Sequence, residues 1–170
     1  NFHGYSTHGG TTYNAYLIVD EKTALIDTVK APFYDEMAAR VREIVTFEEI
    51  DYIISNHVEM DHSGSLPMAL RDASNAKLVT LERFGESGLA KTFHQDWNPI
   101  VVKEGSEIDL GRRRISFIPT PMLHWPDSMC TYLVEDRILF SMDAFGQHVA
   151  TSQRFDDEAD MGTVMQEAAK

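Results

Sequence analysis

The fold is decided by the stretch Tyr52-Ile-Ile-Ser-Asn-His-Val-Glu-Met-Asp-His-Ser-Gly64, in which an apolar run leads into polar side chains. The apolar start predicts a short strand that is buried on both faces. His57, Glu59, Asp61 and His62 then follow within six residues. Because a buried strand fixes where the loop begins, we expect the loop to turn these groups toward one point. Imidazole and carboxylate together suit zinc, iron or manganese, so the stretch predicts a metal site.

Two further candidate ligands follow other predicted strands. His124 comes shortly after a strand predicted over residues 114–119, and Asp143 follows a strand predicted over residues 137–141. A lone histidine is more often a hydrogen-bonded structural residue, and a lone aspartate more often belongs to a turn. Three separate strand ends that each deliver ligand groups are instead expected where one edge of a sheet frames a site.

The rest of the chain alternates short strands with helices. Residues 13–20 and 24–27 predict a strand hairpin. Pro32 suits a helix start, and an apolar stripe with helical spacing follows it. The members of this stripe are Phe33, Met37, Val41 and Ile44. Further helices are predicted over residues 66–71, 83–93 and 156–169, and further strands over residues 77–80, 100–102, 107–110 and 130–134. No repeat or linker divides the sequence, so we expect one α/β (α+β) domain over residues 1–170.

Composition narrows the function classes. The 170 residues carry a net charge of −12, which argues against a nucleic-acid partner. The basic run Arg112-Arg-Arg114 follows Gly111 and predicts a solvated turn. No apolar run approaches the roughly 20 residues that a membrane span needs. Cys130 is the only cysteine, so no intrachain disulfide can form, and we expect a cytoplasmic protein.

These motifs resemble the metallo-β-lactamase superfamily, whose hallmark is His-x-His-x-Asp-His after a strand. They resemble the flavodiiron proteins of anaerobic and facultative microbes more closely, because in that family a glutamate, here Glu59, replaces the second histidine. The resemblance continues through Thr11-Thr-Tyr-Asn-Ala-Tyr-Leu-Ile18, Leu25-Ile-Asp-Thr-Val29, Met122-Leu-His-Trp-Pro-Asp-Ser128 and Asp143-Ala-Phe-Gly-Gln147. It implies a metallo-β-lactamase-like αββα sandwich, incomplete in this chain, that holds two irons.

The resemblance also implies a role for each candidate ligand. His57, Glu59 and His124 match the ligands of one iron. Asp61 matches a ligand of the second iron, and Asp143 matches the carboxylate that bridges both. The harder, more anionic site that a glutamate creates favours a metal that cycles between ferrous and ferric states.

Other positions are less directly matched. His62 occupies a position at which members of the family differ in coordination, and Trp125 and His148 are expected to contact the ligands. The family pattern has one more histidine ligand after the bridging aspartate, whereas no histidine follows His148 here. The FMN-binding flavodoxin domain is also absent from this chain. We therefore expect a partial domain that binds metal weakly, incompletely or not at all and is inactive by itself.

The implied activity is the reduction of O2 to water, or of NO to N2O, with electrons from FMN. Rubredoxin or a similar donor would supply these electrons, and the full-length protein would be a homo-oligomer, a dimer or a tetramer. A zinc hydrolase of the same superfamily, similar to glyoxalase II, is the alternative, and a non-catalytic module is a third possibility. Glu59 and the segment His124-Trp-Pro-Asp-Ser128 favour the redox enzyme.

Overall fold

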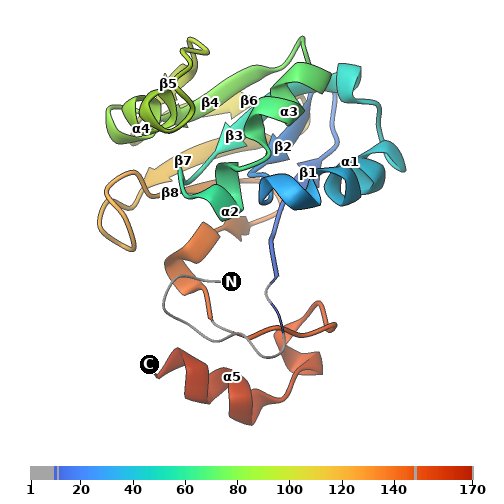
Figure 1. Ribbon diagram of the computed structural model, residues 1–170, viewed down its shortest axis with the longest axis vertical. Coiled ribbons are helices and arrows are strands. Elements are labelled where there is room, and N and C mark those ends of the chain that lie inside the picture. Colours follow the sequence, from blue (N-terminus) through green and yellow to red (C-terminus); the bar gives the residue numbers. More distant parts are fainter. Residues whose placement is uncertain (1–9, 11, 148, 170) are drawn as a thin grey trace.

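The computed structural model describes residue 10, residues 12–147 and residues 149–169, and its strands form two sheets (Figure 1). The strands of the first sheet lie in chain order: β1 (Tyr16–Ile18), β2 (Thr23–Ile26), β3 (Ile50–Ser55), β4 (Lys77–Leu81) and β5 (Ile100–Val102). β1 is antiparallel to β2, and β2 to β5 are parallel. The strands of the second sheet are all antiparallel: β6 (Glu107–Asp109), β7 (Arg114–Pro119), β8 (Met129–Leu133) and β9 (Ile138–Phe140).

The two sheets pack face to face around an apolar core. Successive side chains of a strand point to opposite faces. Ile54 of β3 therefore belongs to the core between the sheets, together with Phe117 and Met129 of the second sheet. Ile53, its neighbour in β3, belongs to the core on the other face. Both isoleucines are fully buried, so the prediction of a strand buried on both faces is confirmed.

Helices cover the outer face of the first sheet, on one side of the sandwich in Figure 1. These helices are α1 (Tyr34–Arg42), α3 (Leu66–Asp72) and α4 (Phe84–Phe93). Met37 and Val41 of α1 share one apolar cluster with Leu66 of α3 and Leu89 of α4. The amphipathic spacing of the sequence thus places these side chains against the sheet.

The outer face of the second sheet is less covered. Ile118 of β7 is 43% exposed and Leu139 of β9 is 42% exposed. In the described part of the chain, the sandwich therefore consists of one helix layer and two sheets. The predicted α/β class, with two facing sheets, is confirmed.

The predicted apolar stripe was partly wrong. A short 3-10 turn, Ala31–Phe33, precedes α1, so the α-helix begins at Tyr34 and not at Pro32. Met37 and Val41 are buried as expected, whereas Phe33 is 45% exposed and Ile44 is 65% exposed. Both exposed residues lie outside α1, where the helical spacing no longer applies.

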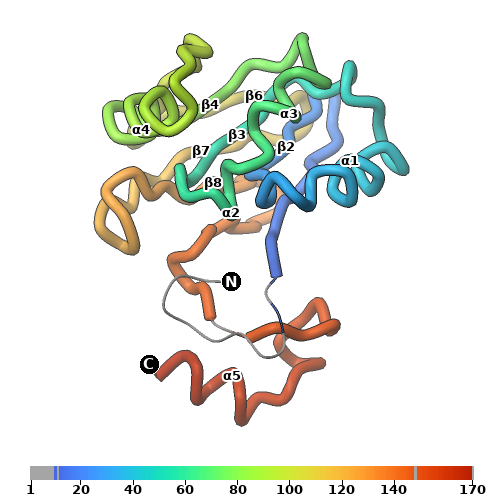
Figure 2. The backbone as a smooth tube through the Cα atoms, in the orientation of Figure 1, coloured from blue at the N-terminus to red at the C-terminus, as the bar shows by residue number. Residues whose placement is uncertain are grey.

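The C-terminal segment, which follows β9, extends away from the sheets (Figure 2). A helix was predicted over residues 156–169, but the α-helix is shorter, α5 (Met161–Ala168), and follows a separate 3-10 turn, Asp156–Glu158. The reason is a cap: the Asp160 carboxylate accepts a hydrogen bond from the Gly162 backbone N–H at 3.2 Å. An N-cap residue lies outside the helical backbone conformation, so the helix starts after it.

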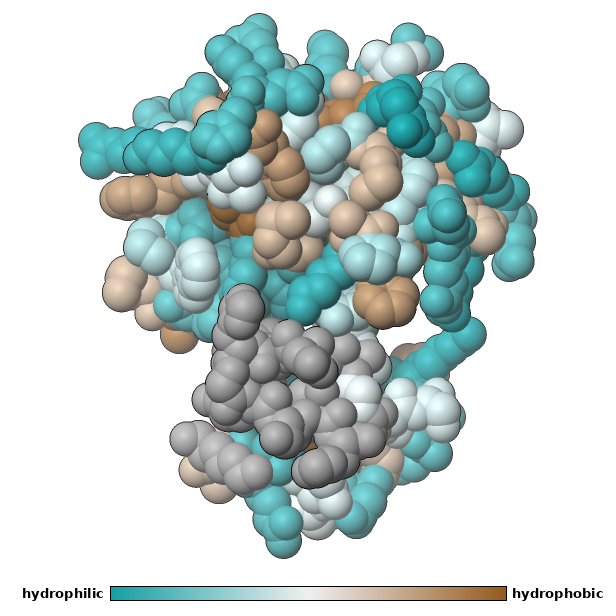
Figure 3. Space-filling view, in the orientation of Figure 1, coloured by the Kyte–Doolittle hydropathy of each residue, from teal (hydrophilic) through white to brown (hydrophobic). Residues whose placement is uncertain are grey.

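Arg112 and Arg113 of the basic run lie in a surface turn, as predicted, next to Gly111 with its φ of +121°, whereas Arg114 is the first residue of β7. Each guanidinium is paired with carboxylates of the same chain, including those of Asp20, Asp136 and Glu135. Hydrophilic side chains also predominate along the upper rim in Figure 3. None of the helices within the described residues combines the length and the apolar character needed to cross a bilayer.

Asp72, at the end of α3, joins α3 to α1. Its Oδ2 accepts hydrogen bonds from the Tyr34 hydroxyl at 2.6 Å and from Arg42 Nη2 at 3.0 Å. The hydrogen bond from Tyr34 lowers the pKa of Asp72 below its ordinary value. A carboxyl whose pKa is lower in the folded state stabilises the fold above its unfolded pKa, about 3.9, and loses this effect as the pH falls through the folded pKa.

We therefore expect Asp72→Asn to lower the free energy of unfolding by about 1 kcal/mol at pH 7, because a hydrogen bond to a charged group is replaced by one to a neutral group. Urea denaturation at a series of pH values measures the difference from the unsubstituted protein. This difference should shrink toward zero below the folded pKa of Asp72. A difference that stays constant with pH would contradict the assignment.

Candidate metal centre

Buried hydrogen bonds to residues of both sheets fix the start of the loop that follows β3. The Asn56 backbone N–H donates to Asp27 Oδ1 at 2.7 Å, and Asn56 Oδ1 accepts from Thr131 Oγ1 at 2.6 Å. Asp27 follows β2 and Thr131 lies in β8, so both sheets hold the start of the loop. The chain then enters the short helix α2 (Met60–Ser63), with Glu59 at its N-cap.

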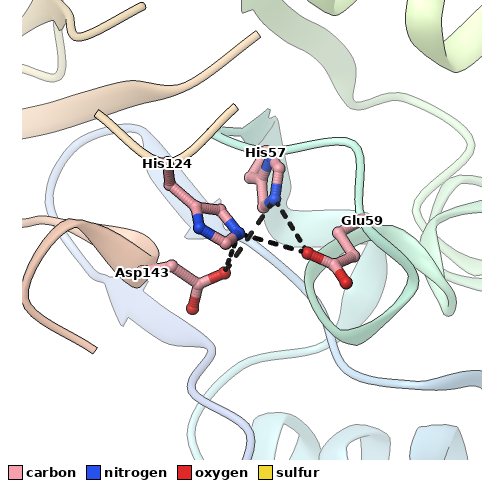
Figure 4. A group of neighbouring side chains, drawn as sticks. All are labelled: His57, Glu59, His124 and Asp143. Carbon is pink, nitrogen blue, oxygen red and sulfur yellow. Dashed lines mark hydrogen bonds and ion pairs between the residues drawn. The ribbon is translucent and has the colours of Figure 1, made fainter. Parts of the chain in front are cut away.

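Four candidate ligands meet in one group, shown in Figure 4. Their potential ligand atoms lie within 4.8 Å of one another. Glu59 Oε2 is 3.3 Å from the Nε2 atoms of both His57 and His124. His124 Nε2 is also 3.4 Å from Asp143 Oδ2. Residues that follow β3, β7 and β9 are thus brought to one place, as the pattern of strand ends predicts.

A second group adjoins the first. The potential ligand atoms of Asp61, His62 and Asp143 also lie within 4.8 Å of one another. His62 Nε2 is 3.1 Å from Asp143 Oδ1, so the two oxygens of Asp143 face different groups. The expectation that His57, Glu59 and Asp61 surround one point was therefore wrong. Asp61 and His62 lie on α2, whose turn directs them to the other side of Asp143.

Burial and ion pairing set the electrostatics of the two groups. Burial lowers the pKa of His62, but the hydrogen bond to Asp143 and the ion pair with Asp27 outweigh it and raise this pKa to about 11. Burial likewise lowers the pKa of His57, and the hydrogen bond to Asp127 outweighs it, so the net shift is upward. Burial raises the pKa of Asp143, but the hydrogen bond from His62 and the nearby histidine charges outweigh burial. The net effect is a pKa below the ordinary value of an aspartate. The Asp143 carboxylate therefore stays ionised, as a cation ligand must be.

The donor set fits a metal ion. Two imidazoles and two carboxylates make up the first group, and a third carboxylate, from Asp61, lies in the second. Asp61 Oδ1 and His62 Nδ1 are buried and have no hydrogen-bond partner among the residues that the structure describes. Buried polar atoms are normally paired, and a bound cation would satisfy the lone pair of Asp61 Oδ1.

Two buried carboxylates were missed by the sequence analysis. Asp127 Oδ2 lies 2.8 Å from His57 Nδ1, and Asp27 Oδ2 lies 3.5 Å from His62 Nδ1. Asp127 belongs to the motif that contains His124, three residues further on, so an acidic residue close to a candidate ligand was the available signal. Asp27 offered its position after a strand and its place in Leu25-Ile-Asp-Thr-Val29, a segment that carries the family resemblance.

The two residues expected to contact the ligands have different outcomes. The Trp125 ring lies edge-on to His57, with 5.3 Å between ring centroids, and stacks near His124 at 6.1 Å. His148 lies outside the described residues. His124 itself has a φ of +118°, an unusual backbone conformation for a residue with a side chain, and such conformations are found at functional sites.

Known proteins resemble this chain over most of its length. The profile of the family described as ODP family beta lactamase matches residues 11–168. The chain is 50% identical to a nitric oxide reductase of Moorella thermoacetica, over 99% of this chain and 43% of that protein. It is 42% identical to rubredoxin-oxygen oxidoreductase of Megalodesulfovibrio gigas, over 96% of this chain and 41% of that protein. The chain thus spans about two-fifths of the length of these relatives.

Solved structures agree with the sequence comparison. The crystal structure of the flavodiiron protein from Giardia intestinalis matches with a TM-score of 0.92 at 40% identity, covering 98% of this chain and 41% of that one. Rubredoxin oxygen:oxidoreductase from Desulfovibrio gigas also matches with a TM-score of 0.92, covering 98% of this chain and 42% of that one. The fold and the predicted resemblance are therefore confirmed, and the chain belongs to the ODP family of β-lactamase-like proteins.

Proposed function

We propose that this domain holds the diiron centre of a flavodiiron oxidoreductase that reduces O2 to water, NO to N2O, or both. The observation that carries the proposal is the position of Asp143 between two groups of ligand atoms. Its Oδ2 lies 3.4 Å from His124 Nε2, and its Oδ1 lies 3.1 Å from His62 Nε2. A carboxylate that faces two groups suits a pair of adjacent metal ions.

Each candidate residue has a place in this proposal. His57, Glu59 and His124 would hold one iron, Asp61 would hold the second, and Asp143 would bridge them. His62 is hydrogen-bonded to Asp143 and would orient this carboxylate or join the second iron. When bound, the two irons would supply the electrons and the open coordination positions that reduction of a diatomic gas requires.

Glu59 favours iron over the zinc of a hydrolase. Its carboxylate lies between the two imidazoles of its group, at 3.3 Å from each. A carboxylate at this position makes the site harder and more anionic than a third imidazole would, and this favours ferric iron. The relatives at 50% and 42% identity are named as reductases, which also supports a redox enzyme over a glyoxalase II-like hydrolase.

The remaining parts of the enzyme lie outside this chain. FMN, bound in a flavodoxin domain, would pass electrons to the irons, and rubredoxin or a similar protein would reduce the flavin. We place the full-length protein in the cytoplasm as a homo-oligomer, a dimer or a tetramer. The unpaired, buried Cys130 is consistent with a reducing compartment.

Metal analysis and gas consumption test this function. We expect the complete gene product, purified without oxygen, to contain two irons and one FMN per chain and to consume O2 or NO when reduced rubredoxin is supplied. The 170-residue chain alone should hold fewer than two irons and consume neither gas. Two zinc ions with thioester hydrolysis would contradict the proposal. Two tightly bound irons in the 170-residue chain would contradict the importance of a further histidine ligand.

A further inference from the structure

Asp127 contacts His57 from the side that faces away from both ligand groups. This carboxylate is 6% exposed. Its Oδ2 lies 2.8 Å from His57 Nδ1 and also accepts the Val58 backbone N–H at 2.7 Å. An ionised carboxylate can only accept hydrogen bonds, so Nδ1 of His57 carries the proton. The other ring nitrogen, Nε2, lies on the side of the ligand group, 3.3 Å from Glu59 Oε2, where it would offer its lone pair to a bound metal ion.

The loop that carries Asp127 is attached firmly to the loop after β3. The Met129 backbone N–H donates to the Asn56 carbonyl at 3.1 Å, next to the contact between Asp127 and Val58. Within the loop, Ser128 Oγ accepts the Trp125 backbone N–H at 3.0 Å. The same loop carries His124, so one segment supplies a candidate ligand and also holds the ring of another.

We propose that Asp127 is a positioning residue of the metal centre, which holds the His57 ring with Nε2 toward the metal and couples its orientation to the loop of His124. The proposal rests on the proposed function for the presence of a metal, and on the described contacts of Asp127 for its mechanism. A carboxylate behind a histidine ligand fixes the tautomer and the ring angle, and its loss typically weakens metal binding about 10–100-fold.

Cobalt(II) is a suitable probe because its visible absorption reports the ligands around it. In the complete gene product stripped of iron, we expect Asp127→Ala to weaken Co2+ binding about 10–100-fold in competition with a chelator. We also expect it to shift the visible absorption bands. Asp127→Asn keeps an oxygen that can accept both hydrogen bonds. Its affinity for Co2+ should therefore lie between that of the unsubstituted protein and that of Asp127→Ala.

Asp72→Asn is the matched control, because Asp72 also joins two segments through hydrogen bonds but contacts neither ligand group. We expect its Co2+ affinity and absorption bands to equal those of the unsubstituted protein. Unchanged Co2+ binding and bands in both Asp127 variants would overturn the positioning role and leave the metal site standing. Equal losses in Asp127→Asn and Asp72→Asn would overturn it as well, since general destabilisation would explain them. Failure of the unsubstituted protein to bind Co2+ would overturn both the positioning role and the proposed function.

Discussion

Asp143→Ala is expected to remove both metal positions at once. The substitution deletes Oδ2, which faces His124, and Oδ1, which faces His62. Losing a contact behind a ligand costs about 10–100-fold in metal affinity, and we expect the loss of a shared ligand to exceed that range. Elemental analysis of the complete gene product should therefore find less than one iron per chain, and consumption of O2 and NO should fall below detection.

The effect of removing a negative charge must be separated from the effect of removing a ligand. Asp156→Ala is the control, because Asp156 lies in an exposed 3-10 turn of the same C-terminal segment and carries the same charge. This variant should keep two irons per chain. Asp143→Asn adds a second comparison, since it keeps one oxygen but cannot bridge as an anion. A full complement of iron in Asp143→Ala would show that Asp143 is not shared between two metals.

The sequence allowed the candidate ligands to be identified, because their residue types are unusual where they occur. His57 and Glu59 follow an apolar strand directly, and three strand ends repeat the pattern. The separation into two groups was implied by the family resemblance and could not be predicted from these positions alone. It depends on the turn of α2, which carries Asp61 and His62 to the far side of Asp143.

The role of Asp127 could not be predicted for a related reason. Its partner His57 is 70 positions away along the chain, so the contact depends on how β8 is placed against the loop after β3. Local signals likewise failed at element ends. Ile44 fits the helical spacing but follows the end of α1, and the cap at Asp160 delays the start of α5. Spacing predicts which residues share a face, whereas tertiary packing and capping decide where an element starts and stops.

Phe117→Ala is expected to have the largest effect on stability. Phe117 of β7 is 2% exposed and fills the core between the two sheets, in the same cluster as Ile54 and Phe140. Truncation of a buried phenylalanine leaves a cavity and typically costs about 3–5 kcal/mol. Urea denaturation of the metal-free protein should show a lower midpoint with little change in slope.

Ile118→Ala is the matched control, because Ile118 is the next residue of β7, points to the opposite face and is 43% exposed. It should change the free energy of unfolding by about 0.5 kcal/mol or less. Since His57 follows a strand of the first sheet and His124 follows a strand of the second, loosening the core should also lower the temperature at which metal is released. Equal effects of the two substitutions on the free energy of unfolding would contradict this role of Phe117. The core between the sheets would then not hold the ligands of the first sheet against those of the second.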